Sequence, residues 1–336
     1  MDSKSGSDPV ERRYDRRIRG VCLISAAAGR RMHLHAGCWV TAAGDDPPRV
    51  AVSIPREFEG AALALESGVL AVSVLARDQA ALVDALFSGR HSLGDLGRTA
   101  FLLTRRGCAV PERALGYLEL ELAHHREFED ALLVVGDVRG GALLREVEPS
   151  LTVNEIQAAG RVRRAVLPRS GFEDAGDSLR RAPVEHPAHG VLGRVLGRRS
   201  FGPMLLTAGR GDDLVRVETR IIQCSHAPPR MLVALPHDSP ALARIRSGRG
   251  FALSLVGADQ RPWLMERMRG ERADTGAWPR SRGGFALLPG AIAHFAVEVE
   301  GELGGGDPSV VVYGHVTQWD WVRPDAPPMA SWPGSF

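Results

Sequence analysis

The sequence predicts a mainly β protein with short helices, built as two similar β-barrels in tandem. Residues 118–122 (LELEL) and 295–300 (FAVEVE) alternate apolar and polar side chains, as a strand with one buried face does. Residues 131–136 (ALLVVG) and 310–314 (VVVYG) are apolar runs that end in turn residues, which is typical of strands buried on both faces. These strand patterns occur once in each half of the chain, so the halves are expected to fold alike.

The second half repeats the first in order and in spacing. The distance along the chain from Pro48 to Gln79 equals that from Pro229 to Gln260. The matching segments are GVCLISAAAG (20–29) with GPMLLTAGRG (202–211), DPPRVAVSI (46–54) with APPRMLVALP (227–236), and GVLAVSVLARDQAALVDALFSG (68–89) with GFALSLVGADQRPWLMERMRG (250–270). A duplication of one domain explains this order.

Two short helices are predicted on the outside of the first barrel. Residues 58–67 place Phe58, Ala62 and Leu65 on one apolar face, and residues 78–88 do the same with Leu82, Ala85 and Leu86. The expected organisation is a flexible tail (1–14), copy one (15–150), a linker (151–190), a degenerate copy two (191–323) and a Pro-rich tail (324–336).

Composition excludes several classes of function. The 336 residues are 44% hydrophobic and 24% charged with a net charge of +2, and no apolar run is long enough to span a membrane. With no secretory signal at the start, a cytoplasmic protein is expected. Lys4 is the sole lysine, so neither a P-loop nor a Schiff-base lysine is available. The Arg-rich segments lack interleaved aromatic residues, which favours a solvated face over a nucleic-acid partner.

Motifs for metal, nucleotide and hydrolase chemistry are absent from the sequence. The four cysteines, Cys22, Cys38, Cys108 and Cys224, form no C-x-x-C pair. No G-x-G-x-x-G follows a strand, and neither G-x-S-x-G nor H-E-x-x-H occurs.

The stretch 32–54 (MHLHAGCWVTAAGDDPPRVAVSI) is the main candidate for a site. It is predicted to form two strands joined by a Gly-Asp-Asp-Pro-Pro turn, with His33, His35, Gly37 and Trp39 on one face. Three interpretations stay open for the histidines: they line a flavin or substrate pocket, they are structural or solvated, or they ligate a metal or haem. A third metal ligand is not visible.

These segments resemble the flavin reductase-like group of the FMN-binding split-barrel superfamily. The resemblance rests on GVCLIS, CWVTAAGDDPPRVAVSI, ESGVLAVSVLARDQ, ALFSG and LLVVGDV in copy one. It covers residues 15–145 well and residues 194–323 more weakly. It implies two tandem split β-barrels that form an intramolecular pseudo-dimer, as a monomer or a homodimer, with any cofactor between the barrels and mainly on copy one.

The resemblance also implies which residues contact the cofactor. They are the cofactor strand His33, His35, Ala36, Gly37, Cys38 and Trp39, the phosphate ligand Arg56, and the strand residues Ser73, Val74 and Leu75. The sequence departs from the family pattern at several of these positions. His33, Ala36 and Cys38 stand where the family has Asn, Thr and Ser, and Ser73 stands at an Asn.

Two further departures bear on catalysis and on copy two. The family histidine of Gly-Asp-His falls on Ala131 in copy one and near Ser309 in copy two, and Arg220 falls at the Trp39 position.

Two functions follow from this resemblance. The first is an FMN-dependent oxidoreductase that passes electrons from NAD(P)H through FMN to free flavin, oxygen, a partner monooxygenase or an organic substrate. The alternative is a split-barrel protein that has lost reductase chemistry and serves as a binding module, or that uses haem or a metal through His33 and His35.

Overall fold

The computed structural model describes most of both predicted copies. The described residues are 20–87, 96, 99–145, 150–152, 155, 172–173, 179–184, 192, 194–196, 202–209, 214–218, 220–268, 277–323 and 325–329. They form two compact units, one within residues 20–196 and one within residues 202–329, here called copy one and copy two. The predicted N-terminal tail and most of the predicted linker lie outside the described residues.

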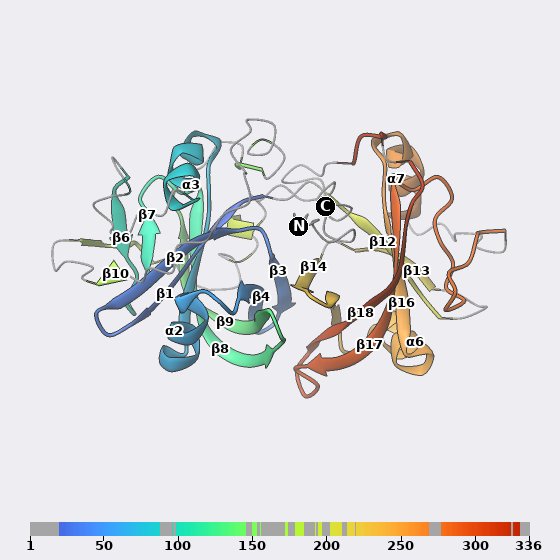
Figure 1. Ribbon diagram of the computed structural model, residues 1–336, viewed down its shortest axis with the longest axis horizontal. Helices are drawn as coiled ribbons and strands as arrows, with labels where there is room; N and C mark the ends of the chain where they lie inside the picture. Colours follow the sequence, from blue (N-terminus) through green and yellow to red (C-terminus); the bar gives the residue numbers. More distant parts are fainter. Residues whose placement is uncertain are drawn as a thin grey trace, which may run out of the picture. The chain divides into compact units, whose positions relative to one another are not determined.

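Copy one contains an antiparallel sheet with the strand order β10-β2-β1-β5-β8-β9-β4-β3 and a small sheet β11-β6-β7 (Figure 1). Its elements are β1 (Cys22–Ala28), β2 (Arg31–Gly37), β3 (Val40–Asp45), β4 (Pro48–Pro55), α2 (Glu59–Ser67), β5 (Val69–Val74), η1 (Arg77–Gln79), α3 (Ala80–Phe87), β6 (Phe101–Leu103), β7 (Ala109–Pro111), β8 (Gly116–Glu127), β9 (Ala131–Leu143), β10 (Phe172–Glu173) and β11 (Arg180–Arg181).

Copy two has the same architecture. Its sheet runs β13-β12-β16-β17-β18-β15-β14, which is the order of copy one from β2 to β3 with each strand replaced by its repeat. Its elements are β12 (Met204–Ala208), β13 (Leu214–Glu218), β14 (Ile221–His226), β15 (Pro229–Pro236), α6 (Pro240–Gly248), β16 (Gly250–Leu255), η3 (Ala258–Gln260), α7 (Arg261–Met268), β17 (Ala293–Leu303) and β18 (Ser309–Trp321).

The register of the strands confirms the duplication residue by residue. Val69 lies opposite Glu121 in copy one, and Gly250 lies opposite Glu298 in copy two. The carbonyl of Trp39 accepts a hydrogen bond from Ser53, as the carbonyl of Arg220 does from Ala234, so Arg220 occupies the Trp39 position. Bulges interrupt the β8–β9 and β17–β18 ladders at matching places.

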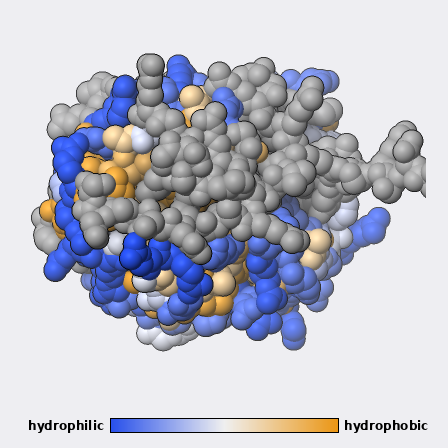
Figure 2. Space-filling model, turned by 60° about the vertical axis from the view of Figure 1, so that its left-hand side comes forward, coloured by the Kyte–Doolittle hydropathy of each residue, from blue (hydrophilic) through white to orange (hydrophobic). Residues whose placement is uncertain are grey.

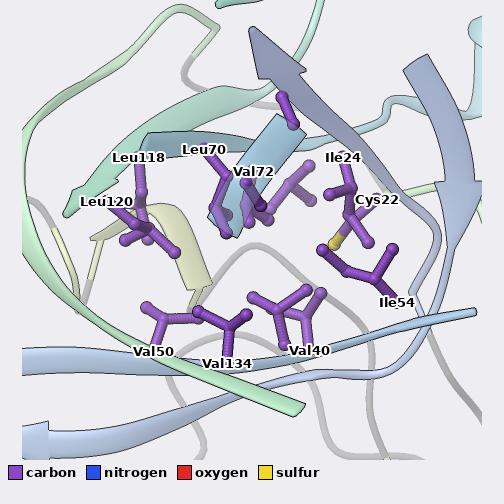
Figure 3. Packing of buried hydrophobic residues seen from close by; sticks show 14 of the residues in the cluster. Cys22, Ile24, Val40, Val50, Ile54, Leu70, Val72, Leu118, Leu120 and Val134 are labelled. Atoms are coloured by element: carbon purple, nitrogen blue, oxygen red, sulfur yellow. The ribbon is translucent and has the colours of Figure 1, made fainter. Parts of the chain in front are cut away.

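Apolar side chains fill the inside of the curled sheet in copy one (Figure 3). Residues from β1, β3, β4, β5, β8 and β9 point toward one another there, among them Ile24, Val50, Leu70 and Leu118. A second core on the other face of the sheet includes Leu23 and Ala71 and is covered by α3, β6 and β7. Because successive residues of a strand point to opposite faces, β1 and β5 contribute to both cores.

The segments after copy one's last long strand pack onto the same unit. Within the predicted linker, β10 pairs with β2, and β11 pairs with β6. Leu192 and Val195 are buried in the interior core of copy one, so the predicted start of copy two at residue 191 was wrong.

The two predicted helices of copy one form at the expected positions, but only one of them buries the predicted face. Helix α3 buries Leu82, Ala85 and Leu86 as expected. Helix α2, in contrast, buries Ala61 and Leu63 and leaves Ala62 and Leu65 exposed. The predicted face was wrong because Phe58 precedes the helix in an extended conformation and so does not share its periodicity.

No helix that the structure describes qualifies as a membrane span. None of the described helices combines the length and the apolar character that crossing a bilayer requires. In the view of Figure 2, hydrophilic residues cover most of the described surface and surround smaller hydrophobic patches.

Candidate functional site

The predicted cofactor strand is two elements rather than one. Strand β2 ends at Gly37 and strand β3 begins at Val40, so the stretch 32–54 forms three strands instead of two. The chain leaves the sheet at Cys38 and Trp39, which are both partly exposed. Trp39 therefore lies outside the strand on which it was expected to share a face with the histidines.

His33 and His35 point to the face of β2 that continues the interior core. They lie opposite Ala26 and Ile24 of β1, whose side chains belong to that core. Both imidazoles contact the Phe58 ring, with ring centroids 5.4 Å and 5.0 Å away, and their own centroids are 5.7 Å apart. The sequence predicts Phe58 only as a helix residue; it reaches this aromatic cluster because it precedes α2 in an extended conformation.

Burial controls the chemistry of His35. Its side chain is 7% exposed, and neither ring nitrogen has a hydrogen-bond partner among the described residues. Burial, followed by the nearby His33, lowers the pKa of His35 well below 6.5. The folded protein therefore holds a neutral imidazole at this point, with one donor and one acceptor available.

A small cavity adjoins the histidines at the edge of the sheet. It has a volume of about 20 Å³ and is lined by both histidines, Phe58 and residues of β2 and α3. This is room for about one water molecule and not for a flavin ring or a haem. A bound water would supply the hydrogen bonds that the His35 ring lacks within the protein.

Helix α2 holds the histidine cluster in place. A Cβ atom on Gly60 would lie 2.8 Å from Cδ2 of His33, which is closer than such atoms approach. Since His33 is only 2% exposed, its ring has little room to move away. The glycine thus permits the helix to approach β2.

Of the two remaining β2 positions predicted to contact the cofactor, Gly37 shares the histidine face as expected, whereas Ala36 does not. Ala36 points to the opposite face and packs against the core beneath α3. Gly37 ends the strand, and a Cβ there would lie 3.2 Å from Ile24. Of the three positions at which the family has Asn, Thr and Ser, His33 and Ala36 therefore face different sides of the sheet.

Arg56 follows β4 and is half exposed. Its Nη2 lies 2.9 Å from Oε2 of Glu127, and its Nη1 donates to the carbonyl of Phe128 at 3.2 Å. The guanidinium therefore pairs with a carboxylate of the protein itself at the β8–β9 turn. Glu127 is not predictable as a partner of Arg56 from the sequence, because no local pattern links two residues so far apart along the chain.

The segment Ser73–Leu75 is buried. Val74 points into the interior core and Leu75 into the core beneath α3, and both are 0% exposed. The Ser73 hydroxyl is buried without a hydrogen-bond partner among the described residues. In copy two the equivalent Ser254 is hydrogen-bonded to Nδ1 of His294 at 3.0 Å.

The Asp-Gln pair of the family motif has a structural role in both copies. The side-chain carbonyl of Gln79 accepts from the Ala76 amide at 3.0 Å, and that of Gln260 accepts from the Gly257 amide at 3.1 Å. The neighbouring Asp78 forms ion pairs with Arg113 and Arg145. This motif therefore closes the turn after β5 or β16.

Metal ligation through the two histidines finds no further ligand in the part of the chain that the structure describes. No group of three or more His, Cys, Asp or Glu side chains suited to a metal ion occurs there. The family-histidine positions are also without histidine, since Ala131 and Ser309 begin β9 and β18 at equivalent places in the register.

The fold and the site together define a class of protein. A curled antiparallel sheet filled by its own side chains, with short helices outside it, is a split β-barrel, and here it occurs twice in one chain. The chain belongs to the flavin reductase like domain family, which matches residues 14–158 and again residues 196–336.

The individual proteins to which the chain is similar share less than a third of the aligned residues with it. A putative diflavin flavoprotein A 5 from Nostoc sp. is 28% identical over 144 residues, which make up 42% of this chain and 25% of the relative. The chain thus spans about a quarter of the length of this curated relative.

Two solved structures are similar to part of the chain. An NADH:FAD oxidoreductase from Streptomyces globisporus is 22% identical with a TM-score of 0.40, over 46% of this chain and 94% of that one. An FMN-binding protein from Thermus thermophilus, solved with bound 1-cyclohex-2-enone, is 26% identical with a TM-score of 0.36, over 43% and 81%.

The contact between α2 and His33 leads to a double-mutant prediction. Gly60→Ala is expected to lower the free energy of unfolding by about 1–3 kcal/mol, because the new methyl group overlaps a buried ring. In a His33→Ala background the same change should be neutral or stabilising by up to about 1 kcal/mol, since alanine is the better helix former. Chemical denaturation of the four proteins measures the coupling. Equal effects of Gly60→Ala in both backgrounds would contradict the contact.

The buried imidazole leads to a prediction about pH. The unfolded chain protonates His35 below about pH 6.5, whereas the folded protein does not, so the unfolded state binds more protons and stability falls as the pH drops. One such group contributes a slope of up to about 1.4 kcal/mol per pH unit. His35→Phe should therefore reduce the loss of stability between neutral pH and about pH 5.5.

Denaturation midpoints at both pH values measure this effect. The control is His125→Phe, which changes an exposed histidine of β8 and should leave the wild-type slope. His294, whose pKa burial lowers to about 4, contributes equally to both proteins. An unchanged slope in His35→Phe would show that His35 is not held neutral by burial.

Proposed function

We propose that the protein is an FMN-binding oxidoreductase of the flavin reductase type, with NAD(P)H as reductant and copy one as the principal flavin site. The observation that carries the proposal is the match of the flavin reductase like domain family to both halves of the chain. Copy one is favoured because it holds the fuller set of family segments and the anion ligand Arg56.

The phosphate end of FMN fits Arg56. A guanidinium binds phosphate with two parallel hydrogen bonds, and this one already holds a carboxylate and a backbone carbonyl. Its ion pair with Glu127 is half exposed on both sides, and such pairs contribute only about 0–1 kcal/mol. A phosphate with more charge than one carboxylate can therefore displace Glu127.

The ring end of FMN has fewer candidate contacts. The cavity beside His35 is too small for it, and Val74 and Leu75 point into closed cores. The partly exposed segment Gly37–Trp39, where the chain leaves the sheet, is the part of the predicted cofactor strand left to meet a ring. When bound, the isoalloxazine would supply the redox chemistry, accepting hydride and passing electrons on.

The chain's own residues would orient the flavin rather than transfer protons. His35 is neutral and buried on the inner face of β2, so its role here is to hold β2 in place by packing against Phe58. Ala131 replaces the family histidine with a methyl group that can neither donate nor accept a hydrogen bond. Electron acceptors compatible with this arrangement are free flavin, oxygen, an organic substrate or a partner monooxygenase.

A second candidate function rests on the same histidines. A protein that binds haem or a metal through His33 and His35 would exploit the two ring nitrogens of His35 that lack a hydrogen-bond partner among the described residues. Phe58 would first have to leave both rings, because it fills the space beside them. The visible spectrum of the purified protein separates the cases: a flavin band supports the first function and a Soret band the second.

The role of Arg56 is tested by FMN titration. Arg56→Ala should weaken FMN binding by about 1.5–3 kcal/mol, the loss for a hydrogen bond to a charged group, whereas Glu127→Gln should tighten it by removing a competing carboxylate. Arg246→Ala is the matched control, because Arg246 is a similarly exposed arginine paired with Glu302 in copy two. Unchanged affinity in Arg56→Ala would remove this residue from the site.

The exchange of the family histidine predicts slow turnover. With saturating FMN, steady-state NADH oxidation should stay below about 10 per second, an ordinary enzymatic rate, because no side chain at position 131 assists the nicotinamide. Turnover at or above this value would show that the exchange does not limit the reaction. Repeating the assay with NADPH, and with oxygen excluded, identifies the reductant and tests whether oxygen is the acceptor.

A further inference from the structure

Copy two contains a cavity that shares no residue with the proposed flavin site. It has a volume of about 350 Å³, at the lower end of the range for small-molecule sites. It lies where the end of α6, the loop before Phe285 and the strands β17 and β18 meet, all within one unit. Its polar side chains include Ser247, Arg249, Glu298 and Thr317.

The equivalent place in copy one is occupied by two arginines. Glu121, which corresponds to Glu298 in the register, forms ion pairs with Arg139 at 2.6 Å and with Arg106 at 3.1 Å. These two arginines hold the pKa of Glu121 below its usual value. In copy one the negative charge of the Glu121 carboxylate is thus balanced by two arginines of the protein itself.

Copy two lacks both arginines. Arg139 is the bulge residue of β9, and the bulge residue of β18 is Thr317. Arg106 lies in a turn in which the amide of Gly107, a glycine of positive φ, donates to the carbonyl of Thr104. Copy two has the same turn, in which the amide of Gly284 donates to the carbonyl of Ser281. Gly283 therefore occupies the position of Arg106. Thr317 and Gly283 both line the cavity, at the two positions where copy one carries these arginine side chains.

The loss leaves the carboxylate available. No ion pair or hydrogen bond joins the Glu298 side chain to any residue that the structure describes, although the carboxylate lines the cavity. The same holds for the guanidinium of Arg249, which lines the cavity from the end of α6. Two opposite charges therefore border one cavity without forming an ion pair with each other.

Arg249 is itself a substitution relative to copy one. It has a φ of 56°, where the equivalent residue is Gly68 with a φ of 68°. A non-glycine residue in this conformation is strained, so the arginine is a costly choice for ending a helix. Its side chain adds a positive charge to the rim of the cavity, which also carries the negative charge of Glu298.

We propose that this cavity binds a small zwitterion with a guanidinium or ammonium group at one end and a carboxylate at the other. The cationic group occupies the place of the two arginine side chains of copy one and pairs with Glu298. The carboxylate pairs with Arg249, and Thr317 and the ring of Phe285 form part of the wall. Free L-arginine carries both groups, with an α-ammonium beside the carboxylate, and is the probe.

The first test is calorimetric titration of the full-length protein with L-arginine. Wild-type protein should bind it, and Glu298→Gln should weaken binding about tenfold or more, because the ionic partner of the cationic group is lost. Thr317→Arg should abolish binding by restoring the side chain that fills this place in copy one. Glu302→Gln, an equal change of charge on the same strand outside the cavity, should bind as the wild type does.

The second test separates the two ends of the ligand with agmatine, which lacks the carboxylate. Arg249→Gly should weaken L-arginine binding about tenfold and should not weaken the binding of agmatine, whose far end is an ammonium group that a guanidinium does not attract. The variant is expected to fold, since copy one has glycine at this point. Equal effects on both probes, or none on L-arginine, would overturn the role of Arg249.

Two results would overturn the site as a whole: no binding of L-arginine by the wild-type protein, or binding that survives both Glu298→Gln and Thr317→Arg. These titrations need no flavin, so their outcome is independent of the proposed oxidoreductase function.

Discussion

Each barrel is filled by apolar side chains of its own strands, and this packing decides where ligands can bind. In copy one, Ile24, Val52 and Leu70 are buried in a core shared by six strands of the sheet, β1, β3, β4, β5, β8 and β9. Each such side chain contributes about 1.5–3 kcal/mol by leaving water. A ligand inside the barrel would have to displace several of them, so ligand chemistry is confined to edges, turns and outer faces.

The same constraint explains the character of the candidate flavin site. Near the edge of the sheet, the buried histidines of β2 pack against Phe58 and border a cavity that holds about one water molecule. At the β8–β9 turn, Arg56 is half exposed and forms an ion pair with Glu127. The positions suited to polar recognition thus lie at the rim, whereas Ser73–Leu75 on the central strand β5 belong to the two cores.

The two copies share their backbone architecture but differ in side chains outside the cores. The strand order, the bulges and the turn after β5 recur in copy two. Side chains that do not fill a core differ, as Arg106 and Arg139 do from Gly283 and Thr317. Because the core alone is enough to hold the sheet together, one copy can lose an ion-pair cluster and gain a cavity without a change of fold.

The sequence by itself determined the β architecture, the duplication and the family, because these depend on the alternation of apolar residues and on segment order, which are local properties. It also determined the positions of α2 and α3. Tertiary structure decided the faces and the partners. Phe58 meets both histidines because it precedes α2, Arg56 meets Glu127 across a long loop of chain, and β2 ends before Trp39. Such contacts arise only when strands distant in sequence pair in one register, and no local pattern encodes which side chains that pairing brings together.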